Sequence, residues 1–295
     1  MGLLCLLMLA GAEEPVDASA KKMLPIYVRE ATEYSLAVES APKKELELKK
    51  EPVFEWTNPL RSTPQQGVVF LWLRNGRPAA IGSIFSQKDD SLPGRRVAHE
   101  LHALDREKLL VSRPAGALNE WKPQAGLERK VLPDAGTPAT TAGARLTQMR
   151  RLAQEFTGHE TNEDDKREDL RLLPAPLYRY PEAKDGVVDG ALFTLVSTEG
   201  TDPEVWLLIE ARKEGGTTRW EYACARFSNR NLYVRHKDKE VWSSVRGEND
   251  NVHHDSLHLY RLFGDKVVDL EGKLLARVRE SPKVWYGEAI PIEDK

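Results

Sequence analysis

The sequence predicts an α+β fold that is mainly antiparallel β, with one prominent amphipathic helix near residues 144–156. Three observations support this prediction. Short apolar segments typical of strands recur in both halves of the chain, turn signals separate them, and one segment has a clear helical period. A strongly curved sheet folded over the helix and a sandwich of two sheets both fit this pattern. With 295 residues and 40% hydrophobic content, the chain has a globular composition and can bury a sizeable core.

The first half contains a strand, a tight turn and a returning strand. GVVFLWL (67–73) is continuously apolar and rich in β-branched and aromatic residues, which is typical of a strand covered on both faces. The dipeptide Asn75-Gly76 follows, and both residues tolerate positive φ, as a hairpin turn requires. We expect AAIGSIF (79–85) to return beside the first strand and RVAHELHAL (96–104) to form another.

The middle of the chain holds a long connection and the predicted helix. Residues 112–143 are rich in Pro, Gly, Ala and Thr, which indicates a surface connection that is partly disordered. In the segment 144–156, an apolar stripe recurs at spacings of three and four residues, and Gly158 ends it. The stripe consists of Leu146, Met149, Leu152, Ala153 and Phe156.

The second half is again rich in strands, which we expect to form an antiparallel meander. The predicted strands, separated by TEGTDP, EGGTT and SNRN, are 190–196, 204–212, 219–227 and 231–237. A last hairpin is expected over 267–278, around Glu271-Gly272. GVVF (67–70) and GALF (190–193) open similar blocks, and the sequence leaves open whether this reflects a duplicated unit or chance.

The start of the chain predicts export. An apolar run from Leu3 to Leu9 precedes Ala10-Gly11-Ala12, the small-residue pattern of signal-peptidase sites, although the usual basic residues are missing and leave the translation start open. A buried N-terminal helix is the alternative. The predicted organisation is a signal peptide (1–12), a polar tail with a first strand (13–44), a β-rich block (45–111), the linker (112–143), and a helix with a second β-rich block (144–295).

Several phrases of the sequence resemble a family of uncharacterised exported proteins of planctomycete bacteria. They are LRLLPAPLYRY (170–180), DGALF (189–193), GTDPE (200–204), EAR (210–212) and Trp220, with similar features over most of residues 50–245. The resemblance implies export to the periplasm or the extracellular space, and it implies no assigned activity.

The densest group of chemically capable side chains is NVHHDSLHLYRLF (251–263). His253, His254, Asp255 and His258 could hold a metal ion if the segment were helical, because positions 254 and 258 would then lie one turn apart. The alternation after them favours a strand, in which these two histidines are roughly 13 Å apart at ~3.3 Å per residue. We therefore expect them on a loop and a solvent-facing strand.

Two further groups are candidates. His99 and His102 in HELH are three residues apart, so a strand directs them to opposite faces and no single metal ion can bind both; we expect a half-exposed strand. Polar and aromatic side chains at alternate positions of the second-half strands could instead converge on a shallow ligand pocket, although ordinary cross-strand pairing is the simpler interpretation. These candidates are Tyr178, Tyr180, Glu210, Arg212 and Trp220.

The sequence excludes some classes of function and favours one. Net charge is −3, and no basic excess indicates nucleic-acid binding; no phosphate-binding loop, nucleophile elbow or cofactor motif occurs, and no apolar run reaches the ~18 residues of a transmembrane helix. Without the signal peptide only Cys224 remains, which excludes an internal disulfide. We expect a non-catalytic exported module, without a cofactor, that binds a ligand, a partner or the cell envelope. The alternatives are a metal-assisted hydrolase using the histidine group and a module that assembles with copies of itself.

Overall fold

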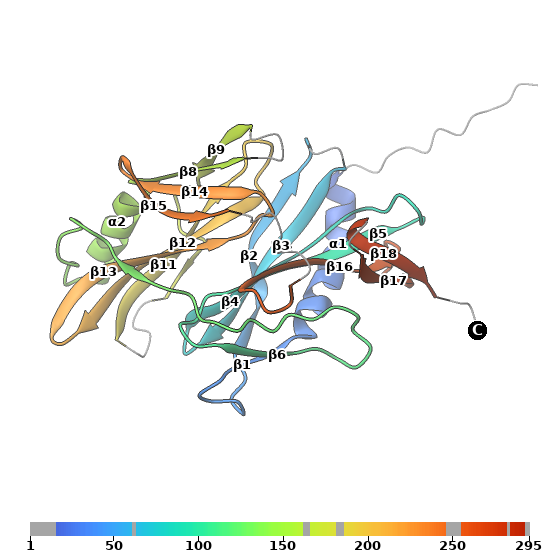
Figure 1. Ribbon diagram of the computed structural model, residues 1–295, viewed down its shortest axis with the longest axis horizontal. Coiled ribbons are helices and arrows are strands. Elements are labelled where there is room, and N and C mark those ends of the chain that lie inside the picture. Colours follow the sequence, from blue (N-terminus) through green and yellow to red (C-terminus); the bar gives the residue numbers. More distant parts are fainter. Residues whose placement is uncertain are drawn as a thin grey trace, which may run out of the picture.

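The structure, a computed structural model, describes residues 16–60, 63–161, 166–180, 186–245, 255–281 and 284–292. In these ranges it is mostly antiparallel β with two helices, which confirms the mainly β, α+β prediction (Figure 1). The predicted helical segment forms α2 (Ala142–Ala153), with Met149 and Leu152 buried. Its prominence is not confirmed, because α1 (Val16–Thr32) is longer and Phe156 begins a strand.

The first sheet has seven antiparallel strands in the order β18-β17-β16-β5-β4-β3-β2. These are β2 (Glu47–Asn58), β3 (Gln65–Arg74), β4 (Arg77–Lys88), β5 (Arg95–Ala103), β16 (Tyr260–Val268), β17 (Leu274–Ser281) and β18 (Val284–Pro291). The predicted hairpin joins β3 to β4, and its residues Asn75 and Gly76 have φ of 52° and 83°. β1 (Ser35–Val38) and β6 (Leu109–Ser112) form a separate pair.

The second sheet has nine strands, in the order β15-β14-β8-β9-β11-β12-β13-β7, with β10 paired to β11. These are β7 (Lys130–Val131), β8 (Phe156–Thr161), β9 (Arg167–Leu172), β10 (Tyr178–Arg179), β11 (Val187–Val196), β12 (Pro203–Glu214), β13 (Thr217–Arg226), β14 (Asn231–His236) and β15 (Lys239–Ser244). The predicted meander is present from β11 to β13. β14 leaves it and pairs with β8 and β15.

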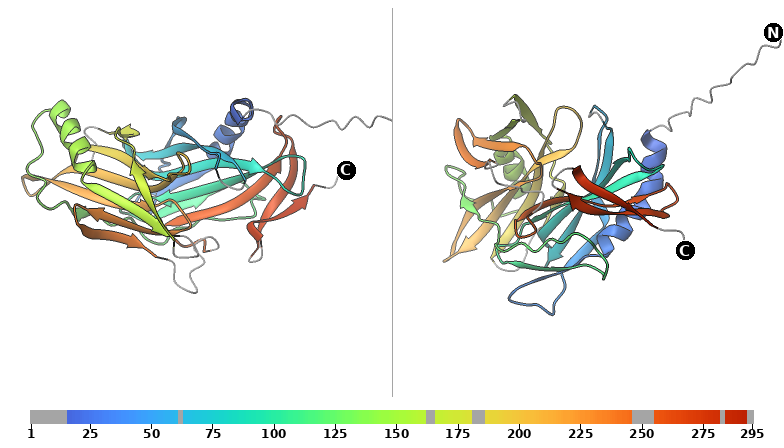
Figure 2. Two further views of the ribbon diagram at one scale, coloured as in Figure 1. Left: turned by 90° about the horizontal axis from the view of Figure 1, so that it is seen from above. Right: turned by 45° about the vertical axis from the view of Figure 1, so that its right-hand side comes forward.

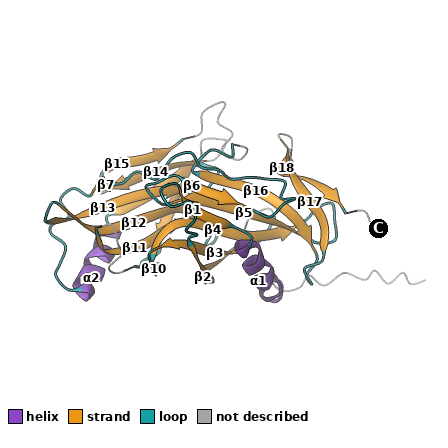
Figure 3. Cartoon of the chain, turned by 90° about the horizontal axis from the view of Figure 1, so that it is seen from below, coloured by secondary structure: helices purple, strands orange, loops and turns teal. Residues whose placement is uncertain are grey.

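The two large sheets are curved, pack face to face, and each carries one helix on its outer face (Figures 1, 2 and 3). Val69 of β3 and Trp206 of β12 belong to the core between the sheets. Successive strand residues point to opposite faces, so Phe70 packs under α1 instead. Phe193 of β11 packs correspondingly under α2. The similar blocks GVVF and GALF therefore occupy equivalent places in the two halves.

The N-terminal segment differs from the predicted polar tail, because α1 begins within it. Met23, Ile26 and Tyr27 lie on the inner face of this helix and are buried against the first sheet. Glu30 interrupts this buried stripe and Pro25 lies inside the helix, so the sequence pattern did not reveal it. Within the described ranges, neither helix is long and apolar enough to cross a membrane.

The predicted linker is ordered over residues 113–127, which we call the strap. Buried Trp121 and Leu127 hold it against the molecule. Its backbone also donates hydrogen bonds from Lys122 to Ser256 and from Gln124 to Leu257, at 2.6 and 3.0 Å. The strap contains little helix or strand but packs against the rest of the molecule. Its proline- and glycine-rich composition did not predict this packing.

The C-terminal strands belong to the first sheet, although the sequence grouped them with the second β-rich block. β16 pairs with β5 from Tyr260↔His102 to Val268↔Arg95, and β17 and β18 follow it outward. The second sheet is therefore inserted in the chain between two parts of the first. The predicted turn at Glu271-Gly272 does join β16 to β17, and Gly272 has a φ of 83°.

Gly82 of β4 is expected to be a point of close packing under α1. A Cβ atom there would lie 2.7 Å from Leu101 and 2.9 Å from Trp72, so Gly82→Ala should destabilise the fold by about 1–3 kcal/mol. Gly143→Ala in α2 is the matched control, since nothing lies within 4 Å of its added Cβ and alanine favours a helix. Urea unfolding of both variants checks this; equal stabilities would contradict the packing described.

Candidate functional site

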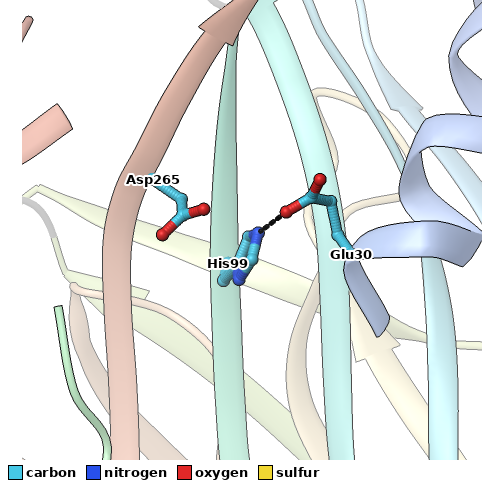
Figure 4. A group of neighbouring side chains, drawn as sticks. All are labelled: Glu30, His99 and Asp265. Carbon is cyan, nitrogen blue, oxygen red and sulfur yellow. Dashed lines mark ion pairs between the residues drawn. The ribbon is translucent and has the colours of Figure 1, made fainter. Parts of the chain in front are cut away.

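The strongest cluster of chemically capable side chains is buried beneath the C-terminal end of α1. Glu30 of α1, His99 of β5 and Asp265 of β16 converge there, and we call them the α1 cluster (Figure 4). Each offers a ligand atom, and these atoms all lie within 4.8 Å of one another. Glu30 and His99 have no exposed surface. The group is therefore shielded from bulk solvent on three sides by elements far apart in the sequence.

Local structure explains why these side chains meet. Glu30 follows Met23 and Ile26 on the inner face of α1, at helical spacing. His99 lies on the face of β5 that packs under the helix. On β16 the register shifts between Gly264 and Lys266, and this β-bulge turns both Asp265 and Lys266 toward α1. The bulge thus places an acid and a base at neighbouring positions on one face.

Charged and polar neighbours surround the cluster. Lys266 Nζ lies 2.7 Å from Glu30 Oε2 and 3.3 Å from Asp265 Oδ2. Arg113 binds both oxygens of Asp265, at 2.8 and 3.1 Å, and lies over the ring of Tyr34. The Tyr34 hydroxyl is 2.6 Å from His99 Nδ1, while His99 Nε2 is 3.6 Å from Glu30 Oε2.

These contacts keep both carboxylates ionised. Burial alone would raise the pKa of Glu30, but His99 and Lys266 outweigh it and lower this pKa. Burial likewise opposes ionisation of Asp265, while His99, Arg113 and Lys266 hold its pKa well below the ordinary value. For Lys266, burial acts to lower the pKa and the carboxylates of Asp265 and Glu30 raise it. Two carboxylates and an imidazole are a donor set for a divalent cation.

A second feature is an open cavity beside the cluster, which we call the strap pocket. Its volume is about 310 Å³, and its lining runs from Val111 to Lys122, including Arg113 and Asn119. Asn119 anchors the strap by donating hydrogen bonds to the carbonyls of Gly264 and Val278, at 2.8 and 3.0 Å. Arg113 belongs both to this lining and to the surroundings of Asp265. The strap pocket and the α1 cluster are therefore neighbours.

Only some of the residues predicted to line a pocket on the second-half sheet lie together. Tyr180 donates a hydrogen bond of 2.8 Å to Glu210, and Tyr178 stacks on Tyr180. Arg77 binds both oxygens of Glu210 at 2.7 and 3.2 Å. The Arg129 guanidinium lies 3.0 Å from the same carboxylate. The Glu210 carboxylate is buried at the packed inner face, between two guanidinium groups.

Trp220 does not join that group, and Arg212 lies near Glu221. Trp220 pairs with Ala211, next to Glu210 along β12, so it points to the opposite face and packs in the core under α2. This corrects the prediction that Trp220 shares a pocket with Glu210. Arg212 is half-buried, 4.0 Å from Glu221. Whether Tyr178, Tyr180 and Glu210 bind a ligand stays a prediction.

The histidine-rich segment is described only in part. His253 and His254 lie outside the described residues, so the predicted metal group is not tested by their positions. Asp255 and His258 form an exposed ion pair, with 3.1 Å between Oδ2 and Nε2. The carbonyl of His258 accepts a 3.1 Å hydrogen bond from Trp121 of the strap. This segment therefore contributes to the anchoring of the strap.

Sequence reasoning missed most of the α1 cluster. His99 and His102 do lie on opposite faces of β5, as predicted, but both are buried. Burial lowers the pKa of His102 to about 4, although its hydrogen bond to the Ala103 carbonyl acts in the opposite direction. Glu30 and Asp265 had no signal of their own. The adjacent acid and base in RLFGDKVV, which interrupt an apolar strand, were the available clue.

The Glu210 group should make stability depend on acid. Burial opposes its ionisation, but Arg129, Arg77 and Tyr180 lower the pKa of Glu210 from 4.5 to about 2. Because this pKa is depressed, the stabilisation is complete above about pH 4.5 and is lost as pH falls toward 2, by up to roughly 3 kcal/mol. Urea unfolding between pH 2.5 and 7 measures it. Glu210→Gln should remove this part of the pH dependence of the unfolding free energy, whereas the exposed control Glu240→Gln should keep it. The same pH dependence in the wild type and both variants would contradict the prediction.

Comparisons with known proteins give no indication of function. No protein-family model, no curated protein and no solved structure matches the chain. The resemblance to exported planctomycete proteins accordingly stays a prediction. The α1 cluster and the strap pocket are the two features from which a function can be argued.

Proposed function

We propose that the protein is a non-catalytic exported binding module whose ligand site is the strap pocket. The observation that carries the proposal is a pre-formed cavity of about 310 Å³ with mixed polar and apolar walls. This volume lies at the lower end of the range of small-molecule sites, which are mostly pre-formed and carry a few fixed polar groups. The corresponding ligand is a small polar solute.

The anchoring of the strap supports a pre-formed site. Asn119 is buried, and its side chain bonds β16 and β17 at once: its amide donates to Gly264 and Val278, and its oxygen accepts from the Glu280 backbone at 3.2 Å. Arg261 of β16 donates to the carbonyl of Glu120 at 3.0 Å. A wall fixed at several points loses little conformational entropy on binding.

The placement of charged side chains supports a non-catalytic role. The carboxylates of Glu30, Asp265 and Glu210 each lie within ion-pair distance of a lysine or arginine of the same chain. A general base or nucleophile must be within hydrogen-bond reach of a substrate. These groups are buried and serve the attachment of α1 and the packing of the two sheets.

Filling the pocket tests the proposal. Ala117 lines it, so Ala117→Trp should weaken binding at least tenfold by occupying the space. The exposed Ala125 lies on the same strap outside the lining, and Ala125→Trp is the matched control. Thermal shift followed by calorimetry, with amino acids, sugars, dicarboxylates and diamines as probes, should identify at least one binding class. Absence of binding by every class, or equal affinity in Ala117→Trp, would contradict the proposal.

Export is part of the same proposal, and cleavage after Ala12 would leave the described helix α1, Val16–Thr32, whole. The mature protein should therefore begin at Glu13 and keep α1 intact. N-terminal sequencing of the protein recovered from the envelope and medium fractions of an expressing bacterium checks this. Recovery of the uncleaved chain from the cytoplasm alone would be evidence against export.

A further inference from the structure

We propose that Glu30, His99 and Asp265 form a binding site for one divalent transition-metal ion, such as Zn²⁺ or Mn²⁺, which takes the place of the Lys266 ammonium. The inference is independent of the strap-pocket proposal. It concerns a closed site that joins α1 to the first sheet and stabilises that attachment. Because the site is buried, the ion has a structural role.

The first argument is convergence. A helix and two strands supply one imidazole and two carboxylates with ligand atoms within 4.8 Å of one another. Around an ion with ligand bonds of about 2.0–2.2 Å, neighbouring donor atoms are roughly 3–3.5 Å apart. His99 Nε2 and Glu30 Oε2 are already at 3.6 Å. Side-chain shifts of about 1 Å would bring all three donors to ligand distance.

The second argument comes from buried atoms without hydrogen bonds. Three fully buried atoms of the described residues lack a hydrogen-bond partner here: the two carboxylate oxygens of Glu30 and Nε2 of His99. The Lys266 ammonium lies 2.7 Å from Glu30 Oε2, so Glu30 Oε1 and His99 Nε2 are the two atoms that this contact leaves unsatisfied. Such orphaned groups are rare, and a missing ion is one explanation for them. When His99 donates from Nδ1 to Tyr34, its Nε2 lone pair faces the two carboxylates.

The third argument is charge. Glu30, Glu33 and Asp265 carry three negative charges, and Arg113 and Lys266 carry two positive charges around them. One negative charge is left over when His99 is neutral; a proton on His99 offsets it in the metal-free cluster, and a bound ion displaces that proton. If a divalent ion replaces the ammonium, three negative charges face three positive charges. Neutrality matters here because an unbalanced charge in a buried site is costly.

Lys266 is suited to exchange with an ion. Its side chain is 14% exposed, whereas those of Glu30 and His99 are fully buried. Its Nζ is also 3.7 Å from Glu33, whose side chain is 28% exposed and nearer the surface. The ammonium can therefore turn past Glu33 into solvent, which takes its charge out of the cluster. The same movement opens the path by which an ion would enter.

Metal binding by the full chain tests the inference. After treatment with chelator, the protein is titrated separately with Zn²⁺, Mn²⁺ and Co²⁺, with metal analysis, the visible spectrum of Co²⁺ and melting temperature as readouts. We expect about one ion per chain, a Co²⁺ spectrum of a nitrogen- and oxygen-ligated site, and a raised melting temperature. Failure of all three ions to bind would overturn the inference.

Two variants locate the site. His99→Gln should weaken binding at least tenfold, because it removes the imidazole donor. Lys266→Met should tighten binding at least tenfold, because it removes the competing ammonium; a merely structural lysine would not give that result. If either variant is less stable, circular dichroism establishes its folding, and added Zn²⁺ should restore the melting temperature of Lys266→Met.

The matched control is the double variant Asp255→Asn, His258→Gln, which removes the exposed acid–histidine pair and should leave binding unchanged. Loss of binding in this control would place the ion at the histidine-rich segment and overturn the inference. Binding that His99→Gln does not weaken, or that Lys266→Met does not tighten, would do the same.

Discussion

The pairing of β5 with β16 is the constraint on which the rest of the structure depends. It joins strands that are far apart in the sequence and completes the first sheet as far as β18. The bulge in this pairing turns Asp265 and Lys266 toward α1. The same strand offers the carbonyl of Gly264 to Asn119 of the strap. One strand pair therefore sets the position of the helix, of the charged cluster and of the strap.

Much of the β architecture could be predicted from the sequence, because its signals are local. Strands covered on both faces, such as GVVFLWL, are apolar at every position, and Asn75-Gly76 supplies the positive φ that its hairpin needs. The order of the strands in the sheets could not be predicted from such local signals. No local signal indicates that β16 pairs with β5 rather than with a neighbour in sequence. The helix α1 was missed because Glu30 interrupts its buried stripe and Pro25 is unusual inside a helix.

The candidate site was hidden for a related reason. Each member of the α1 cluster looks ordinary in its own segment, since a lone glutamate in a helix or an acid–base pair on a strand is usually solvated. Only long-range pairing brings Glu30, His99 and Asp265 together. The Glu210 group was partly foreseen because Tyr180 and Glu210 lie in segments that are close in sequence, whereas Arg77 and Arg129 come from elsewhere.

The insertion of the second sheet between β5 and β16 has a consequence for the kinetics of folding. A ribosome delivers α1 and β2 to β5 first, then the whole second sheet, and the closing strands last. The edge of β5 that pairs with β16 stays unpaired until β16 has been synthesised. The strands of the second sheet, by contrast, all lie within one continuous stretch of the chain. Non-local strand pairing is slow because the loop must close before its contacts form. The inserted half should mature early, and closure of the first sheet should limit the overall rate.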